Sequence, residues 1–181
     1  TMTFVAGSSW QPDEDLFIEY FNQHPEVKLI IAPHVIDENH LVEIIRKLKR
    51  PYVRYTRADE KNVRKADCLI IDCFGLLSSI YRYGEIAYIG GGFGVGIHNT
   101  LEAAVYGIPV IFGPKYQKFQ EAIQLLEAKG AFSVKDYEEL KTLLDRMLAD
   151  EVFLRESGMN ASNYVTSNAG ATDKIMSMIN F

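Results

Sequence analysis

The chain has 181 residues, of which 48% are hydrophobic and 24% charged, and its formal net charge is -5 at pH 7. This composition is typical of a globular protein with a substantial core, and the length allows one large domain or two small ones. The acidic balance argues against general nucleic-acid binding, and no apolar run reaches the roughly 18 residues that a membrane-spanning helix needs.

Short β-rich runs alternate with helical patterns along the chain. Strands are predicted at residues 4–6, 27–32, 52–55, 68–72, 86–89, 110–112 and 131–134. Helices are predicted at residues 13–23, 37–48, 75–83, 99–106 and 167–181, within a mostly helical region after residue 117. The helix at 99–106 has Gly107 just past its end and Pro109 two residues later, which is a usual helix stop. Alternation of this kind predicts βαβ units, and therefore one α/β domain with a Rossmann-like parallel sheet flanked by helices.

The cysteines and histidines give no sign of a metal or a disulfide. Cys68 and Cys73 lie five apart on one predicted strand and face opposite sides, so they cannot pair locally, and free cysteines fit a reducing compartment. The four histidines, at positions 24, 34, 40 and 98, lack metal-ligand spacing. We expect no bound metal and no cofactor.

Six cations without an intervening acid follow the second predicted helix. They are Arg46, Lys47, Lys49, Arg50, Arg54 and Arg57. One interpretation is a helix C-terminus whose cations suit the helix dipole, followed by a solvated strand edge. The alternative is a patch for a membrane surface or an acidic ligand.

In parallel α/β sheets, ligands bind beyond the carboxyl ends of the strands, near the point where the strand order reverses. Here glycines, hydroxyls and histidines follow the predicted strands. The segments concerned are Gly7-Ser8-Ser9, Pro33-His34, Cys73-Phe74-Gly75, the glycine cluster before His98, and Gly113-Pro114-Lys115. This edge is the predicted binding site.

The glycine cluster comprises Gly90, Gly91, Gly92, Gly94 and Gly96. It does not fit the dinucleotide fingerprint, and Ile97 and His98 stand where a phosphate-binding loop of the P-loop type needs Lys and Ser or Thr. A turn alone needs one or two glycines, so we predict that the cluster brings backbone N–H groups close to a ligand. Asn99 and Glu102 allow two interpretations, either a capping box for the following helix or a site with His98 at a phosphate and Glu102 at ribose hydroxyls.

These residues resemble the C-terminal, donor-binding half of a GT-B glycosyltransferase, and more narrowly the 3-deoxy-D-manno-octulosonic acid (Kdo) transferases of lipopolysaccharide synthesis. The family pattern G-x-H-N-x-x-E is matched by Gly96, His98, Asn99 and Glu102. Other family elements are matched, in order, by Gly7-Ser8-Ser9, Pro33-His34, Asp72 with Gly75 and Leu77, and Gly113-Pro114 with Phe119. The chain departs from the pattern at Ala32, which precedes Pro33-His34 without the family's basic residue, at Ala103, and at Lys115 and Lys118.

The resemblance implies inverting transfer of Kdo from CMP-Kdo to a lipid A precursor, without an essential metal. It implies that the phosphate lies on the N–H groups of Gly91 and Gly92 near His98 and Asn99, and that Glu102 holds the ribose. The remaining implied donor-site residues are Ser8, Ser9, Pro33, His34, Phe74 and Gly75. Charge complementarity assigns Lys115 to the Kdo carboxylate.

The resemblance also implies that residues 1–181 are one half of a two-domain enzyme. The N-terminal acceptor domain, with the carboxylate base and the contact with the cytoplasmic face of a Gram-negative inner membrane, is expected outside this chain. We therefore expect the chain alone to bind nucleotide without transferring sugar. Alternatives are the donor domain of a UDP-sugar transferase, a nucleotide-sugar 2-epimerase, and a non-catalytic nucleotide-binding module. The preference for cytidine or uridine separates the first two from a Kdo transferase, and the effect of His98 and Glu102 on binding tests the last.

Overall fold

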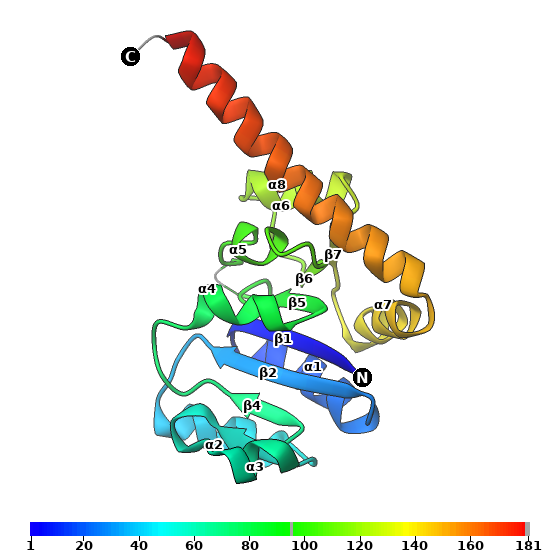
Figure 1. Cartoon of the computed structure of the whole chain (residues 1–181). Coiled ribbons are helices and arrows are strands. Elements are labelled where there is room, and N and C mark those ends of the chain that lie inside the picture. Colours follow the sequence, from blue (N-terminus) through cyan, green and yellow to red (C-terminus); the bar gives the residue numbers. More distant parts are fainter. Residues whose placement is uncertain (95, 180–181) are drawn as a thin grey trace.

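The computed structural model describes residues 1–94 and 96–179, and it contains one seven-stranded sheet (Figure 1). The strands are β1 (Met2–Ser9), β2 (Val27–Pro33), β3 (Tyr52–Arg54), β4 (Cys68–Ile70), β5 (Ile86–Ile89), β6 (Val110–Phe112) and β7 (Ala131–Ser133). Their order is β3-β4-β2-β1-β5-β6-β7, and every neighbouring pair is parallel. The prediction of a parallel α/β sheet is confirmed.

Helices cover both faces of the sheet. They are α1 (Gln11–Gln23), α2 (Glu38–Lys47), α3 (Glu60–Lys65), α4 (Leu77–Ile80), α5 (Leu101–Ala104), α6 (Gln120–Glu127), α7 (Tyr137–Ala149) and α8 (Glu151–Ile179), with 3-10 turns η1 (Tyr55–Arg57) and η2 (Tyr81–Tyr83). Side chains from α1, α2 and α7 form one buried cluster with the sheet, and side chains from α4, α5, α6 and α8 form the other. Because both faces are covered, the central strands are continuous apolar runs, and every residue of β5 and β6 is buried.

The strand order reverses between β1 and β5. From β1 the chain moves outward on one side to β2, β3 and β4, and it then crosses to β5, β6 and β7 on the other side. The connections that leave the carboxyl ends of β1 and β5 therefore diverge, and a crevice opens between them. Ser8 and Ser9 end β1 and Gly90 follows β5, so these predicted residues border the crevice.

The predicted and observed elements agree best at the central strands. The predicted ranges 86–89 and 110–112 coincide with β5 and β6. The helix predicted at 99–106 is shorter, because α5 ends before a turn in which Gly107 has a φ of +72°. The helix predicted at 75–83 divides into α4 and η2, and the final helix begins at Glu151, well before the predicted start. The last two positions of the predicted final helix, 180 and 181, lie outside the described residues.

One prediction about the cysteines is wrong. Cys68 lies on β4, but β4 ends at Ile70, so Cys73 belongs to the following loop and the two do not share a strand. Both thiols are free; Cys68 is buried and Cys73 is partly exposed. Burial raises the pKa of the Cys68 thiol well above its usual range, which makes this side chain an unreactive part of the core.

Helix α8 is held by very close backbone contacts along its first half. A Cβ on Gly158 would lie 2.1 Å from the carbonyl oxygen of Gly107, and one on Gly130 would lie 2.6 Å from the Cα of Ala161. Glycine is therefore required at both positions. Beyond this contact α8 projects from the domain (Figure 1), and residues 166–179 are all exposed. Among the described residues no helix is both long and apolar enough to cross a membrane.

Candidate functional site

Backbone contacts bring four of the predicted segments together at the carboxyl edge of the sheet. The His34 N–H donates to the Ser9 carbonyl at 2.9 Å, which joins the ends of β1 and β2. The Gly90 N–H donates to Gly7 at 2.9 Å, and the Lys115 N–H donates to Gly92 at 2.8 Å. The turns after β1, β2, β5 and β6 therefore form one continuous surface.

The glycine cluster is shaped largely by this packing. A Cβ on Gly90 would lie 2.1 Å from the Ser8 carbonyl oxygen, and one on Gly92 would lie 2.6 Å from the Cα of Gly113. Gly91 and Gly96 have φ values of +99° and +111°, which side chains rarely allow. Contacts within the protein therefore account for four of the five glycines. Their number does not by itself indicate a ligand.

An aromatic stack lies beside the glycine turn. The Trp10 ring stacks on His34 with centroids 4.4 Å apart, and His34 faces His98 at 4.7 Å. Burial lowers the pKa of His98, the neighbouring His34 lowers it further, and the charge of Glu102 opposes both. At neutral pH His98 is therefore a neutral imidazole that can donate or accept a hydrogen bond.

Two buried carboxylates beneath this surface were missed by the sequence analysis. Asp13 is 1% exposed and accepts hydrogen bonds from the Tyr88 hydroxyl, the Gly91 N–H and the Trp10 N–H. Glu14 is fully buried, accepts from the Ser9 hydroxyl at 2.8 Å, and lies 3.0 Å from His40 Nε2. Burial raises the pKa of both carboxyls. Acids in a first helical turn are usually solvated, so nothing in the sequence marked these two as buried. The one available signal was that Asp13 lies three residues after Trp10, the spacing at which a side chain can accept from the N–H of the N-cap residue.

Two of the predicted binding groups are already used within the protein. The Gly91 N–H donates to Asp13 at 3.1 Å, so a phosphate at this N–H would compete with Asp13, and the predicted contact stays a prediction. The Ser9 side chain is 1% exposed and its hydroxyl donates to Glu14, so Ser9 shapes the turn from below. Pro33 is likewise buried, at the end of β2, whereas His34 is exposed.

Asn99 and Glu102 do not form the capping box that was one of their two interpretations. The residue before α5 is Thr100, and the Asn99 side-chain oxygen accepts instead from the Leu101 N–H at 2.9 Å. The Glu102 carboxylate is left half-buried near His98, where its charge opposes the lowering of the His98 pKa and adds to the raising of the Tyr81 pKa that burial causes. Its position is compatible with the ribose-binding interpretation.

A cationic hollow of about 320 Å³ opens next to the glycine turn. It is lined by Gly94, Gly96, Lys115, Gln117, Lys118 and Phe119. The Phe119 ring packs beneath Gly96, where an added Cβ would lie 3.0 Å from the ring edge. Both lysines are exposed. Two ammonium groups on an otherwise uncharged wall suit an anionic ligand such as a carboxylate or a phosphate.

Phe74 and Gly75 lie on the loop between β4 and α4. Phe74 is 83% exposed, and a Cβ on Gly75 would meet no atom within 4 Å. These two residues stand in open solvent, and no described contact draws them onto the surface formed by the other turns. Their predicted part in binding remains a prediction.

Three of the six cations in the run have structural partners. The Arg50 guanidinium donates to four backbone carbonyls between α1 and β2 and stacks on Phe21. Arg54 pairs with Glu38 and Asp72, and Lys47 pairs with Asp15. For these three cations the structure favours the interpretation as a helix end and strand edge over a patch for membranes or acidic ligands.

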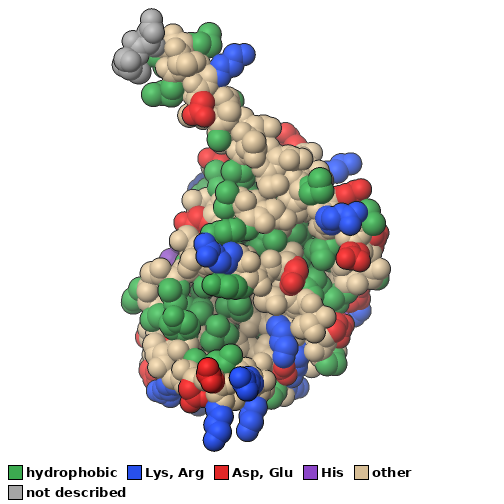
Figure 2. All heavy atoms as spheres, in the orientation of Figure 1, with side chains coloured by type: hydrophobic (Ala, Val, Ile, Leu, Met, Phe, Trp, Pro, Cys, Tyr) green, Lys and Arg blue, Asp and Glu red, His purple; other side chains and the backbone are tan. Residues whose placement is uncertain are grey.

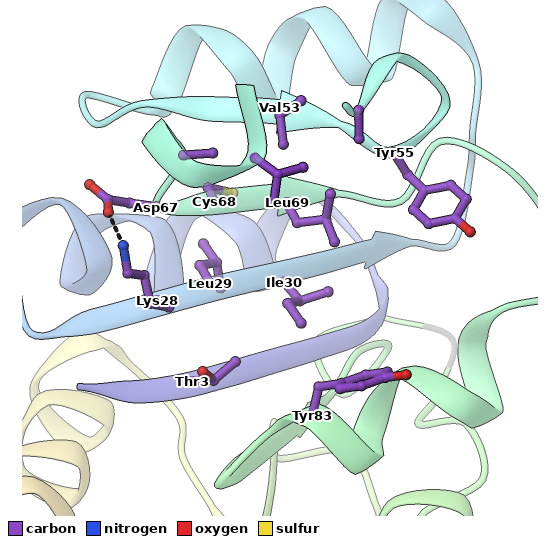
Figure 3. A pocket seen from close by; sticks show the side chains of 13 residues that line it. Thr3, Lys28, Leu29, Ile30, Val53, Tyr55, Asp67, Cys68, Leu69 and Tyr83 are labelled. Atoms are coloured by element: carbon purple, nitrogen blue, oxygen red, sulfur yellow. Dashed lines mark hydrogen bonds and ion pairs between the residues drawn. The ribbon is translucent and has the colours of Figure 1, made fainter. Parts of the chain in front are cut away.

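A second hollow of about 340 Å³ lies away from this edge, over β2 and β4 (Figure 3). Its lining is apolar apart from Thr3, the Lys28–Asp67 ion pair and the two tyrosines, Tyr55 and Tyr83. Figure 2 shows hydrophobic side chains gathered on one side of the molecule, with lysines and arginines below them. Among the described residues no cluster of three or more His, Cys, Asp or Glu side chains is placed to hold a metal ion.

Comparison with known sequences identifies relatives that are named as glycosyltransferases. No family model matches the chain. It is 34% identical over 151 residues to a 3-deoxy-D-manno-octulosonic acid transferase of Aquifex aeolicus. The aligned region covers 80% of this chain and 41% of the relative. It is 27% identical over 174 residues to the enzyme of that name from Chlamydia muridarum, covering 93% of this chain and 40% of the relative. The chain thus spans about two fifths of the length of these relatives.

Two solved structures share the fold. The C-terminal CMP-Kdo binding domain of WaaA from Acinetobacter baumannii superposes with a TM-score of 0.77 at 19% identity, covering 91% of this chain and 89% of that domain. HepE of Anabaena, in complex with UDP and glucose, gives a TM-score of 0.66 at 13% identity, covering 98% of this chain and 48% of HepE. At these identities the comparisons establish the architecture, a parallel sheet flanked by helices as in the C-terminal half of a GT-B glycosyltransferase.

Proposed function

We propose that this chain, which is similar to 3-deoxy-D-manno-octulosonic acid transferases over about two fifths of their length, is the donor side of such an enzyme and binds CMP-Kdo. The reaction is inverting transfer of Kdo to a lipid A precursor in lipopolysaccharide synthesis. The observation that carries the proposal is the joining of four strand-end turns around His34 and His98, at the reversal of strand order.

The chemistry of the donor explains why cations lie at this edge. In CMP-Kdo the phosphate is a diester with one negative charge. When the acceptor hydroxyl attacks the anomeric carbon, the bond from that carbon to the phosphate oxygen breaks and CMP leaves with a second charge. Groups that hold the phosphate more strongly as this charge develops accelerate the transfer. We place the phosphate against the Gly92–Gly96 part of the turn, between His98 and the lysines of the cationic hollow.

The ribose and the Kdo sugar of the donor are assigned to side chains of suitable charge that lie near the phosphate position. The half-buried Glu102 carboxylate, beside His98, accepts hydrogen bonds from the ribose hydroxyls. The Kdo carboxylate pairs with Lys115 at the hollow, and His34 lies beside the sugar. The Asn99 side chain is exposed next to this site and its oxygen already accepts from Leu101. No residue of this chain is assigned as the catalytic base.

We place the carboxylate base and the membrane contact in the part of the relatives that this chain does not match. On this view residues 1–181 form the donor domain, and the active site lies between it and an N-terminal acceptor domain of the same protein. The full-length enzyme then acts at the cytoplasmic face of the inner membrane, and the chain alone binds nucleotide without transferring sugar. Measurable Kdo transfer by the isolated chain would contradict this division of roles.

Calorimetric titration with CMP, UMP and UDP tests the proposal. We expect a preference for CMP that is weakened about tenfold in Glu102→Ala, because a hydrogen bond to a charged group contributes roughly 1.5–3 kcal/mol. The matched control is Glu127→Ala at the exposed end of α6, which should bind like the wild type.

The other outcomes separate the alternatives. A preference for UDP would indicate a UDP-sugar transferase or an epimerase, which the fold shared with HepE allows. Equal binding by the wild type and Glu102→Ala, with no effect of His98→Ala, would contradict the assigned site and favour a non-catalytic module.

A further inference from the structure

Asp13 is a charged residue beneath the binding edge that the proposed site does not use. It lies in the first turn of α1 and is only 1% exposed, so a ligand on the surface cannot touch it. A buried carboxylate is costly unless it is well hydrogen-bonded. Its partners therefore indicate what it does in the fold.

The carboxylate joins three segments that are far apart in the sequence. Oδ1 accepts from the Tyr88 hydroxyl on β5 at 2.7 Å. Oδ2 accepts from the Gly91 N–H at 3.1 Å and from the Trp10 N–H at 2.9 Å. Only the bond from Trp10 is local; the other two partners are 75 and 78 residues away. An ordinary helix cap makes the local bond alone.

The two N–H groups that donate to Asp13 belong to the two sides of the binding surface, the aromatic stack and the glycine turn. Trp10 stacks on His34, which faces His98, and Gly91 begins the turn that continues to Gly96. Oδ2 of Asp13 thus accepts one N–H from the aromatic stack and one from the glycine turn. The two hydrogen bonds hold these two parts of the surface at a fixed separation.

We propose that Asp13 is a positioning residue that fixes the glycine turn against the Trp10–His34–His98 stack and thereby sets the affinity for the nucleotide donor. The inference rests on the proposed function for the identity of the ligand. Its physical basis is that removing the carboxylate leaves two buried backbone donors and the Tyr88 hydroxyl without their acceptor, and the turn must move to satisfy them.

Two substitutions at Asp13 distinguish the effect of its hydrogen bonds from the effect of its negative charge. Asp13→Ala removes every acceptor, and we expect nucleotide affinity to fall about tenfold. Asp13→Asn keeps an oxygen for Gly91 and Trp10, while its amide can donate to Tyr88, because a tyrosine hydroxyl also accepts. This variant should bind within about threefold of the wild type. Tyr88→Phe, which removes one of the three bonds, provides a milder variant in case Asp13→Ala does not fold.

A stability control distinguishes positioning from general destabilisation. Leu144→Ala empties part of the core near the amino ends of β1 and β2, beside Phe4 and Val27 and at the opposite end of the sheet from the glycine turn. It should lower the melting temperature, as Asp13→Ala does, yet leave nucleotide affinity within about twofold of the wild type. All titrations with CMP are made at a temperature where each variant is fully folded. Amide hydrogen exchange at Gly91, Gly92 and Gly94 is followed in parallel.

Selective loss of CMP affinity in Asp13→Ala, rescue in Asp13→Asn, and faster exchange at Gly91 confined to the Ala variant support the proposal. Unchanged CMP affinity in folded Asp13→Ala, or an equal loss in Leu144→Ala, overturns it. If the wild type binds none of CMP, UMP and UDP, the proposed function fails and the statement about affinity falls with it. The exchange comparison then still decides whether Asp13 fixes the turn, since unchanged exchange would contradict that part.

Discussion

Lys115 and Lys118 are the exposed cations of the hollow beside the glycine turn, and Lys115 is held by a backbone bond to that turn. The Lys115 N–H donates to Gly92, so the main chain at this residue is fixed while its side chain is exposed to solvent. A lysine at a fixed position acts as a point charge for a carboxylate or phosphate.

Replacing Lys115 by Ala should weaken CMP-Kdo more than CMP, because only the first ligand carries the sugar carboxylate. We expect a loss of about three- to tenfold for CMP-Kdo, as for one partly exposed charged hydrogen bond, and a smaller loss for CMP. Parallel calorimetric titrations measure both, with Lys49→Ala as a control at an exposed lysine away from the site. Equal losses for the two ligands would remove the assignment of the carboxylate to Lys115.

At the residue scale, the sequence predicted the strand-end turns that the structure joins, but not the buried acids beneath them. The turns after β1, β2, β5 and β6 were predictable, because glycines, hydroxyls and histidines at strand ends mark a binding edge. The burial of the Asp13 and Glu14 side chains was not predictable, since acids at a helix start are normally solvated. For the same reason the uses of the Ser9 hydroxyl and the Gly91 N–H were not foreseen.

At the element scale, periodicity located the strands because the buried parallel sheet requires unbroken apolar runs. The ranges at 86–89 and 110–112 coincided with β5 and β6, both buried throughout. The short helices were harder to bound. Residues 75–83 lack a cap that selects one helix type, and they divide into α4 and η2. The region after residue 150 gave no sign that α8 would run unbroken from Glu151 to Ile179.

The contact between α8 and the turns before β6 and β7 should depend on glycine. Gly158→Ala places a methyl group 2.1 Å from the Gly107 carbonyl oxygen, and we expect a destabilisation of about 1–3 kcal/mol in urea unfolding. The matched control is Gly170→Ala in the same helix, where an added Cβ meets no atom within 4 Å; its unfolding free energy should stay the same or rise by up to about 1 kcal/mol, because alanine is the better helix former. Similar effects at both positions would contradict the contact.

At the scale of the whole molecule, the outer half of α8 adds little to the stability of the domain. Residues 166–179 are all exposed, and they include the apolar side chains of Ile175, Met176, Met178 and Ile179. Deleting residues 167–181 should therefore leave the melting temperature within about 2 °C, since a loss below 0.5 kcal/mol shifts it no further. It should also reduce concentration-dependent self-association, measured by light scattering, because exposed apolar groups are removed. A large drop in melting temperature would show that this segment packs on the domain.

The contacts that join the strand-end turns run through the main chain, and this has a consequence for how the family diverges. Backbone-to-backbone contacts such as His34 to Ser9 and Lys115 to Gly92 place almost no demand on the outward side chains. Substitutions can therefore accumulate on the rim while the glycines and buried acids beneath it keep the geometry constant. Lys115 and Lys118, both exposed, are departures of this kind, in a chain only 34% identical to its Aquifex relative. Such a scaffold allows donor preference to drift over evolutionary time without the fold being rebuilt.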